Sequence, residues 1–188
     1  EKVPGEYQMT DAYIRHVTAK TPKNIGHLEI LAFENYAVHP ESPPVSDEAL
    51  DLFTDYGVQF VSDLKEIVGD NELEVEVWNE YNGKAEYFNK SNQPPESYAK
   101  MLKATYSKLK QHHPDVKIWG GGTIRVANAW LERVIKAGGG DYVDGISIHP
   151  YTNKSSPERG GAIPQIIALK EMLAENGYPD MPLRATEW

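Results

Sequence analysis

The sequence predicts an α/β fold on a parallel sheet, because short apolar strands alternate with amphipathic helices along its 188 residues. Polar and aromatic residues also follow one strand after another. The carboxyl ends of the strands are the face on which a β/α barrel builds its site. The glycine-rich segment 120–123 has neither the G-x-G-x-x-G spacing of a dinucleotide-binding fold nor a phosphate-loop lysine. A (β/α)8 TIM barrel is therefore predicted rather than a doubly wound sheet.

The predicted barrel is incomplete in this chain. A complete barrel has eight strands in about 250 residues, whereas this sequence supplies five predicted strands. We expect them to be about strands 3 to 7, with their helices. Because an open parallel sheet would leave unpaired edges, we expect another segment or another chain to complete the barrel.

The elements of the first half follow from local signals. An amphipathic stretch predicts a helix over 9–21, and apolar residues predict a strand over 28–33. Ser46 is a good N-cap for the next helix, whose apolar residues recur at helical spacing until Gly69. The alternating run that follows predicts a strand over 74–78.

The second half repeats the pattern after a long polar loop over 79–93. Proline is favoured in the first turn of a helix, so a helix is predicted from Pro95 to just before Pro114. The remaining predicted elements are a strand over 117–119, a helix over 128–136, a strand over 145–148, a helix over 163–176 and a strand over 183–186.

Composition excludes several classes of function. The formal net charge is −9 and the basic residues are scattered, so neither nucleic acid nor a membrane surface is an expected partner. No run of about 18 apolar residues occurs. Cysteine is absent, which removes thiolate chemistry but leaves the compartment open; a secreted or periplasmic location is favoured. We expect no cofactor and no metal, since His112 and His113 are adjacent at a helix end and no H-E-x-x-H motif occurs.

Two glutamates mark the candidate chemistry. Glu80 ends the tripeptide Trp-Asn-Glu just after one predicted strand, and Glu187 lies in Thr-Glu-Trp after the last one. Cleavage of a glycosidic bond needs a proton donor for the leaving oxygen and a negative charge near the anomeric carbon, which two carboxyl groups supply. His149 and Tyr151 follow a third strand and could orient a carboxylate or fill a sugar site. An isolated glutamate in a loop is usually only solvated; the three elements in strand order carry the prediction.

With these motifs the chain resembles clan A retaining glycoside hydrolases, nearest to family 39-like members, with family 5 a near alternative. The resemblance implies that residues 1–188 are part of one catalytic TIM-barrel domain. It implies that Glu80 is the general acid/base and Glu187 the nucleophile, in retaining hydrolysis of a β-linked oligo- or polysaccharide. It further implies that Asn79 binds the sugar 2-hydroxyl and that Tyr151 contacts the nucleophile. Tyr81 stands where the family usually has proline.

Further substrate contacts are predicted from aromatic and polar residues at the strand ends. Tyr81 and Trp188 lie beside the two glutamates, and Asn35 follows an earlier strand. Core packing is the alternative for such rings, and we expect it for Trp119, inside a strand, and for Trp130, on a helix.

Two other functions stay open. A carbohydrate-binding pseudoenzyme or inactive barrel fragment would keep the cleft without turnover. A metal-dependent hydrolase would use His149, Glu80 and Glu187 as ligands.

Overall fold

The computed structural model describes residues 27–31, 43–69, 72–83, 93–152 and 156–188, and for 27–31 it describes the backbone alone. The predicted helix over 9–21 and the candidate residue Asn35 lie outside these ranges.

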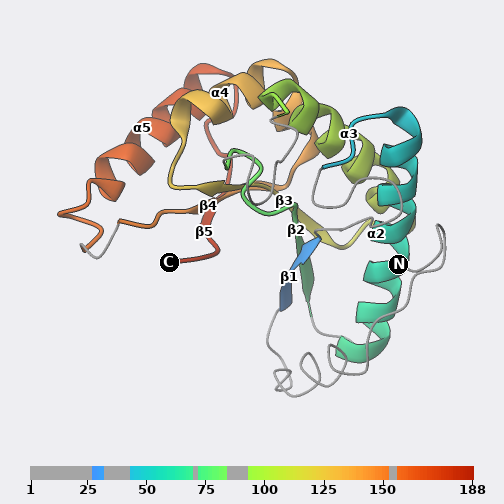
Figure 1. Cartoon of the computed structure of the whole chain (residues 1–188). Coiled ribbons are helices and arrows are strands. Elements are labelled where there is room, and N and C mark those ends of the chain that lie inside the picture. The colour runs from blue at the N-terminus through green and yellow to red at the C-terminus, as the bar shows by residue number, and fades with distance from the viewer. Residues whose placement is uncertain (1–26, 32–42, 70–71, 84–92, 153–155) are drawn as a thin grey trace.

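A five-stranded parallel sheet forms the centre of the fold (Figure 1). Its strands are β1 (His27–Leu31), β2 (Leu73–Val77), β3 (Lys117–Ile124), β4 (Gly145–His149) and β5 (Leu183–Ala185). Each strand pairs with the next one along the chain, in the order β1-β2-β3-β4-β5. A doubly wound sheet reverses its order at a switch point, whereas consecutive order is that of a barrel wall. The predicted incomplete barrel is confirmed.

Within the described ranges, four α-helices lie along one side of this sheet (Figure 1). They are α2 (Asp47–Val68), α3 (Pro95–His112), α4 (Asn128–Lys136) and α5 (Ala162–Glu175), with a short 3-10 helix, η1 (Gly139–Tyr142), after α4. The predicted start and end signals of α2 are confirmed. Ser46 Oγ accepts a hydrogen bond from the N–H of Ala49 at 3.1 Å, and Gly69, at φ 63°, donates its N–H to Lys65 O. None of the helices in the described ranges is long and apolar enough to cross a membrane.

Both faces of β2 are buried. Alternation along a strand sends Leu73, Val75 and Val77 to one face and Glu74 and Glu76 to the other. The three apolar residues join the core that also contains the inner faces of α2 and α3. The two glutamates therefore point to the inside of the barrel wall, where they too are buried.

Strand β3 is longer than predicted, because the glycine-rich segment belongs to the strand and not to a loop. A Cβ atom at Gly121 would lie 2.3 Å from Ser147 O of the neighbouring strand, so only glycine allows this approach. Gly121 and Gly122 have φ values of 120° and 47°, and the pairing of β3 with β4 shifts register between Gly120 and Thr123. This irregularity brings the backbone of Gly122 against the Glu76 carboxylate, 3.0 Å from where its Cβ would be.

Candidate active site

Glu80, His149 and Glu187 meet at the carboxyl edge of the sheet. Glu80 follows β2, His149 ends β4, and Glu187 follows β5. One oxygen of each carboxylate and one ring nitrogen of His149 all lie within 4.8 Å of one another. The structure thus brings together the two glutamates that the sequence analysis paired.

His149 lies at the centre of this group with no exposed surface. Its Nδ1 is 3.3 Å from Glu80 Oε1 and 3.7 Å from Glu187 Oε2, and its Nε2 is 3.3 Å from Glu76 Oε1. Burial lowers the pKa of the imidazole, but the hydrogen bond and charge of Glu76, with help from Glu80 and Glu187, outweigh it and raise the pKa above 6.5. The prediction that His149 binds substrate stays a prediction; in this arrangement the ring contacts the carboxylates of Glu76 and Glu80.

Tyr151 contacts the other carboxylate. Its hydroxyl donates a hydrogen bond to Glu187 Oε2 at 2.9 Å, and that bond raises the pKa of the phenol. Tyr151 is 40% exposed, so a ligand can reach it while its hydroxyl holds Glu187. The ring of His149 packs edge-on against it, with centroids 6.5 Å apart.

Glu80 stands on a strained backbone. Trp78 has φ 66° and Glu80 has φ 47°, in the left-handed region that costs a residue with a side chain about 1–2 kcal/mol. The Glu80 N–H donates to Gly122 O at 2.8 Å, and the Gly83 N–H donates to Glu80 O at 2.7 Å. Asn82 adds a two-way bond to the backbone of Ile124 at the end of β3. The irregular strand β3 therefore holds the turn that carries Glu80.

Asn79 lies in the same turn and is half-buried. Its side-chain oxygen is buried and has no hydrogen-bond partner among the described residues. An unpaired buried oxygen costs free energy that a donor from a ligand would recover. The prediction that Asn79 contacts substrate remains a prediction, with this oxygen as its observation.

Tyr81 does not lie at the mouth of the site. It has no exposed surface, and its ring packs against Tyr98 and Trp130 with centroids 4.9 and 6.1 Å away. Burial raises the pKa of its phenol. The prediction that Tyr81 contacts sugar is wrong, because the turn after Glu80 directs the ring under α3 and α4. Trp119 and Trp130 pack in the interior as expected, whereas Trp188 is 67% exposed and its contact with substrate stays a prediction.

Glu76 is a residue of the site that the sequence did not predict. This carboxylate is completely buried, and besides His149 it accepts a 2.7 Å hydrogen bond from the Thr186 hydroxyl. The signal was present in the alternating run of β2: a polar face is ordinarily assigned to solvent, but in a barrel wall it faces the interior. A glutamate there requires partners.

Glu74 has a different set of partners one layer below. Arg184 and the Trp119 indole N–H both bind its carboxylate, the indole at 2.6 Å, and the Arg184 guanidinium lies 4.5 Å from the centre of the Trp119 ring.

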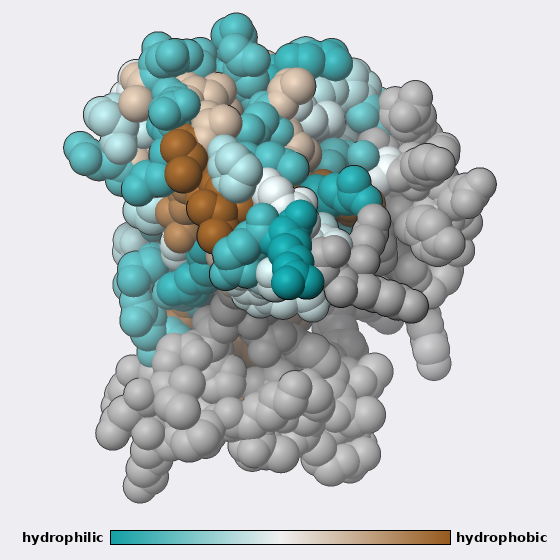
Figure 2. Space-filling view, turned by 90° about the vertical axis from the view of Figure 1, so that its left-hand side faces the viewer, coloured by the Kyte–Doolittle hydropathy of each residue, from teal (hydrophilic) through white to brown (hydrophobic). Residues whose placement is uncertain are grey.

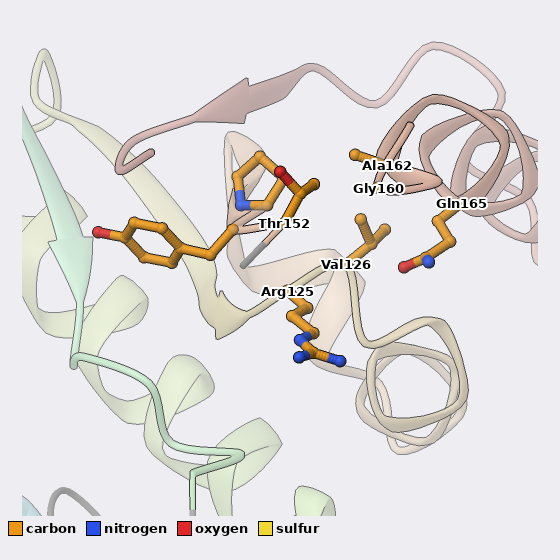
Figure 3. A pocket seen from close by; sticks show the side chains of 8 residues that line it. Arg125, Val126, Thr152, Gly160, Ala162 and Gln165 are labelled. Atoms are coloured by element: carbon orange, nitrogen blue, oxygen red, sulfur yellow. The ribbon is translucent and has the colours of Figure 1, made fainter. Parts of the chain in front are cut away.

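A pocket of about 100 Å³ opens beside Tyr151. Figure 3 shows its lining from the segment after β3, the segment after β4 and the start of α5. Arg125 is exposed at this pocket and has φ 60°, and its N–H donates to His149 O at 2.9 Å. The pocket is therefore linked to the carboxylate pair in two ways. The backbone of Arg125 is hydrogen-bonded to His149, and the side chain of Tyr151 lines the pocket and binds Glu187.

The same three residues, Glu80, His149 and Glu187, are spaced as metal ligands could be. Both ring nitrogens of His149 are, however, within hydrogen-bonding distance of carboxylates. A metal ion would have to bind the lone pair of His149 Nδ1, the nitrogen that here faces Glu80. The hydrogen-bonded arrangement fits a protonated ring better than a ligand.

Comparison with known proteins gives the fold. No family model matches the chain, and no curated protein does. A family 39 glycoside hydrolase from Bacteroides cellulosilyticus WH2 matches 99% of the chain at a TM-score of 0.69 and 22% identity. The family 39 enzyme from Xanthomonas axonopodis pv. citri and a monomeric β-xylosidase from Caulobacter crescentus CB15 each match 74% of it, at TM-scores of 0.58 and 0.60 and identities of 18% and 22%.

The chain spans 40% of the first of these proteins and 30% and 31% of the other two. The chain therefore has the fold of one part of a family 39 glycoside hydrolase barrel.

Proposed function

We propose that this chain is part of a retaining glycoside hydrolase that cleaves a β-linked oligo- or polysaccharide, with Glu187 as nucleophile and Glu80 as general acid/base. The observation that carries the proposal is that one carboxylate oxygen of Glu80 and one of Glu187 lie within 4.8 Å of each other at one sheet edge. Retaining enzymes hold their carboxyl groups about 5–5.5 Å apart, and inverting ones about 6.5–9.5 Å to admit a water. The shorter class fits.

The reaction would proceed in two displacements. Glu187 attacks the anomeric carbon while Glu80 gives its proton to the leaving glycosidic oxygen, so that a glycosyl ester forms and the C–O bond breaks. Glu80, now a carboxylate, then takes a proton from a water molecule. That water attacks the anomeric carbon and releases Glu187 as a carboxylate.

The surrounding groups suit this division of roles. Tyr151 donates its O–H to Glu187, which stabilises an ionised nucleophile and steadies the oxygen that attacks. Asn79 offers its unpartnered oxygen beside Glu80. Tyr151 and the exposed Trp188 supply rings for the apolar C–H faces of a sugar. The pocket at Arg125 and Gln165 gives a longer substrate a second place of contact.

The full-length protein should be tested first on aryl β-glycosides, beginning with an aryl β-xyloside because one structural neighbour is a β-xylosidase. Glu80→Gln and Glu187→Gln should each abolish turnover and leave sugar binding in place. Glu171→Gln, which changes an exposed glutamate on α5, is the matched control and should leave the rate unchanged.

Three results would contradict the proposal. Turnover that survives Glu80→Gln and Glu187→Gln would remove the two-glutamate mechanism. Loss of turnover with a strong chelator, restored by added metal, would favour the metal-dependent hydrolase. Sugar binding by the wild-type protein without product release, over a broad panel of glycosides, would favour the binding pseudoenzyme.

A further inference from the structure

Glu76 is a buried carboxylate that joins three strands. From the middle of β2, its Oε1 lies 3.3 Å from His149 Nε2 at the end of β4, and its Oε2 accepts from Thr186 Oγ1 just after β5. Within the described ranges, no lysine or arginine lies within ion-pair distance of it, and His149 is the one group there that can supply a positive charge.

This environment favours a charged imidazole. An ionised carboxylate buried without a cation is costly, and a proton on Nε2 provides both the charge and the hydrogen bond. If Nε2–H donates to Glu76, Nδ1–H is free to donate to Glu80 on the other side of the ring. A ring with both nitrogens protonated is an imidazolium.

The same contact also fixes the orientation of the ring. Nε2 is held toward the interior, so Nδ1 must face the mouth of the site, 3.3 Å from Glu80 and 3.7 Å from Glu187. Without an acceptor at Glu76 the ring could flip or lose a proton. Either change would withdraw the donor from the reactive pair.

We propose that Glu76 is a positioning residue: it holds His149 as a doubly protonated ring against Glu80 and Glu187, and through Thr186 it ties the nucleophile segment to β2. The catalytic part of this inference rests on the proposed function; the charge and orientation of His149 do not. The titratable groups around the ring are Glu76 from β2, Glu80 and Glu187 from the segments after β2 and β5, and Tyr151 after β4. Tyr98 of α3 is a further titratable group near Glu76: burial, together with the charge of Glu76, raises the pKa of its phenol.

The direct test is the protonation of His149 in the full-length protein labelled with 15N-histidine. Long-range 1H–15N spectra distinguish a doubly protonated ring from either neutral tautomer, and His149→Gln assigns the signal. At pH 7.5 the wild-type ring should carry both protons. In Glu76→Gln it should be neutral at that pH, and the pH at which it titrates should move down.

Glu74→Gln is the matched control. Glu74 lies two residues away on the same strand and the same inner face, is nearly as buried, and binds Arg184 and Trp119 instead of His149. It should leave the His149 signal unchanged. In activity, Glu76→Gln should lower kcat/KM by about 10- to 100-fold, the range expected for the loss of a hydrogen bond to a charged group. It should also shift the alkaline limb of the pH profile to lower pH, which Glu74→Gln should not do.

The outcomes separate this inference from the proposed function. A singly protonated His149 in the wild type at pH 7.5, or an unchanged signal and pH profile in Glu76→Gln, would overturn the inference while leaving a two-glutamate glycosidase intact. Absence of glycosidase activity would not affect the spectra. If Glu76→Gln does not fold, the wild-type spectrum still decides the protonation. Comparing Thr186→Val with Thr186→Ser then tests whether the Thr186 hydroxyl ties the nucleophile segment to Glu76 of β2, and equal activity of the two variants would overturn that part.

Discussion

Glu74 and Glu76 occupy the same strand, the same inner face and nearly the same degree of burial, yet their surroundings differ in kind. Glu74 is neutralised by Arg184, a permanent cation that also stacks on Trp119. Glu76 faces His149, whose charge changes near neutral pH. The lower layer, Glu74 with Arg184, is thus an ion pair with one charge state. The upper layer, His149 with the three glutamates that it contacts, can take up and release protons. The difference between the two layers therefore comes from the cationic partner, Arg184 or His149, and not from the glutamate or its burial.

The largest expected effect is in the upper layer. Glu187→Ala should lower kcat of the full-length protein by at least about 10⁴-fold, because the covalent intermediate cannot form. Azide should restore product with inverted configuration, since it attacks directly from the vacated side. Azide with Glu80→Ala should instead give a retained glycosyl azide. Product stereochemistry by NMR checks both, and the opposite pair of outcomes would exchange the two roles.

Breaking the lower layer should cost stability and not chemistry. Arg184→Met leaves the buried Glu74 carboxylate without its main cation, and Lys117, 3.8 Å away, only partly replaces it. We expect the free energy of unfolding in urea to fall by about 2 kcal/mol. Arg133→Met, which removes an exposed ion pair with Glu96, is the control and should give no measurable change. A stability loss as small as the control's would show that the lower layer is not a structural ion pair.

Tyr151→Phe should produce a smaller effect on turnover. It removes the hydroxyl that donates to Glu187 and keeps the ring. We expect kcat/KM to fall about tenfold, the effect of losing one hydrogen bond to a charged group at a partly exposed site. Unchanged steady-state rates on an aryl glycoside would mean that Glu187 is positioned by His149 alone.

The smallest expected effect is a pH dependence of stability that only the upper layer possesses. Burial lowers the pKa of His149 in the folded state, but Glu76, Glu80 and Glu187 outweigh this effect, so the folded-state pKa is raised. The contribution of His149 to the free energy of unfolding is therefore complete below the unfolded-state pKa of about 6.5, and it is lost as the pH rises through the folded-state pKa. Urea unfolding across that interval should show a decline that His149→Gln removes. A decline that persists in His149→Gln would assign the proton to another group.

The sequence predicted those elements whose ends carry local signals. Ser46 and Gly69 bound α2, because caps act through neighbouring residues; the predicted 128–136 helix also matches α4, although no side chain caps the start of that helix. The extent of β3 was missed because the close approach of Gly121 to Ser147 is a contact between strands. Such a contact leaves no trace in local composition.

The candidate site divides in the same way. Glu80, Glu187, His149 and Tyr151 were predicted from their places after strands, and the structure brings all four together. Glu76 was not, since alternation alone does not tell whether a polar face meets water or a barrel interior. The burial of Tyr81 depends on rings from α3 and α4, so only the folded arrangement shows it.

One side of the described fold has an apolar surface. Ile163 and Ile167 of α5 are 43% and 53% exposed, and Figure 2, which views this side, shows hydrophobic residues gathered there among hydrophilic ones. In a barrel each helix packs between two neighbours. This surface and the outer edge of β5 are where the completing part of a barrel would join.

The left-handed conformation of Glu80 sets two evolutionary demands against each other. Glycine adopts φ near 47° without penalty, so a library selected for heat resistance alone should accumulate glycine at position 80. A library selected for product formation should retain glutamate there and tolerate a lower melting temperature. The ancestry of this position would then record which demand prevailed.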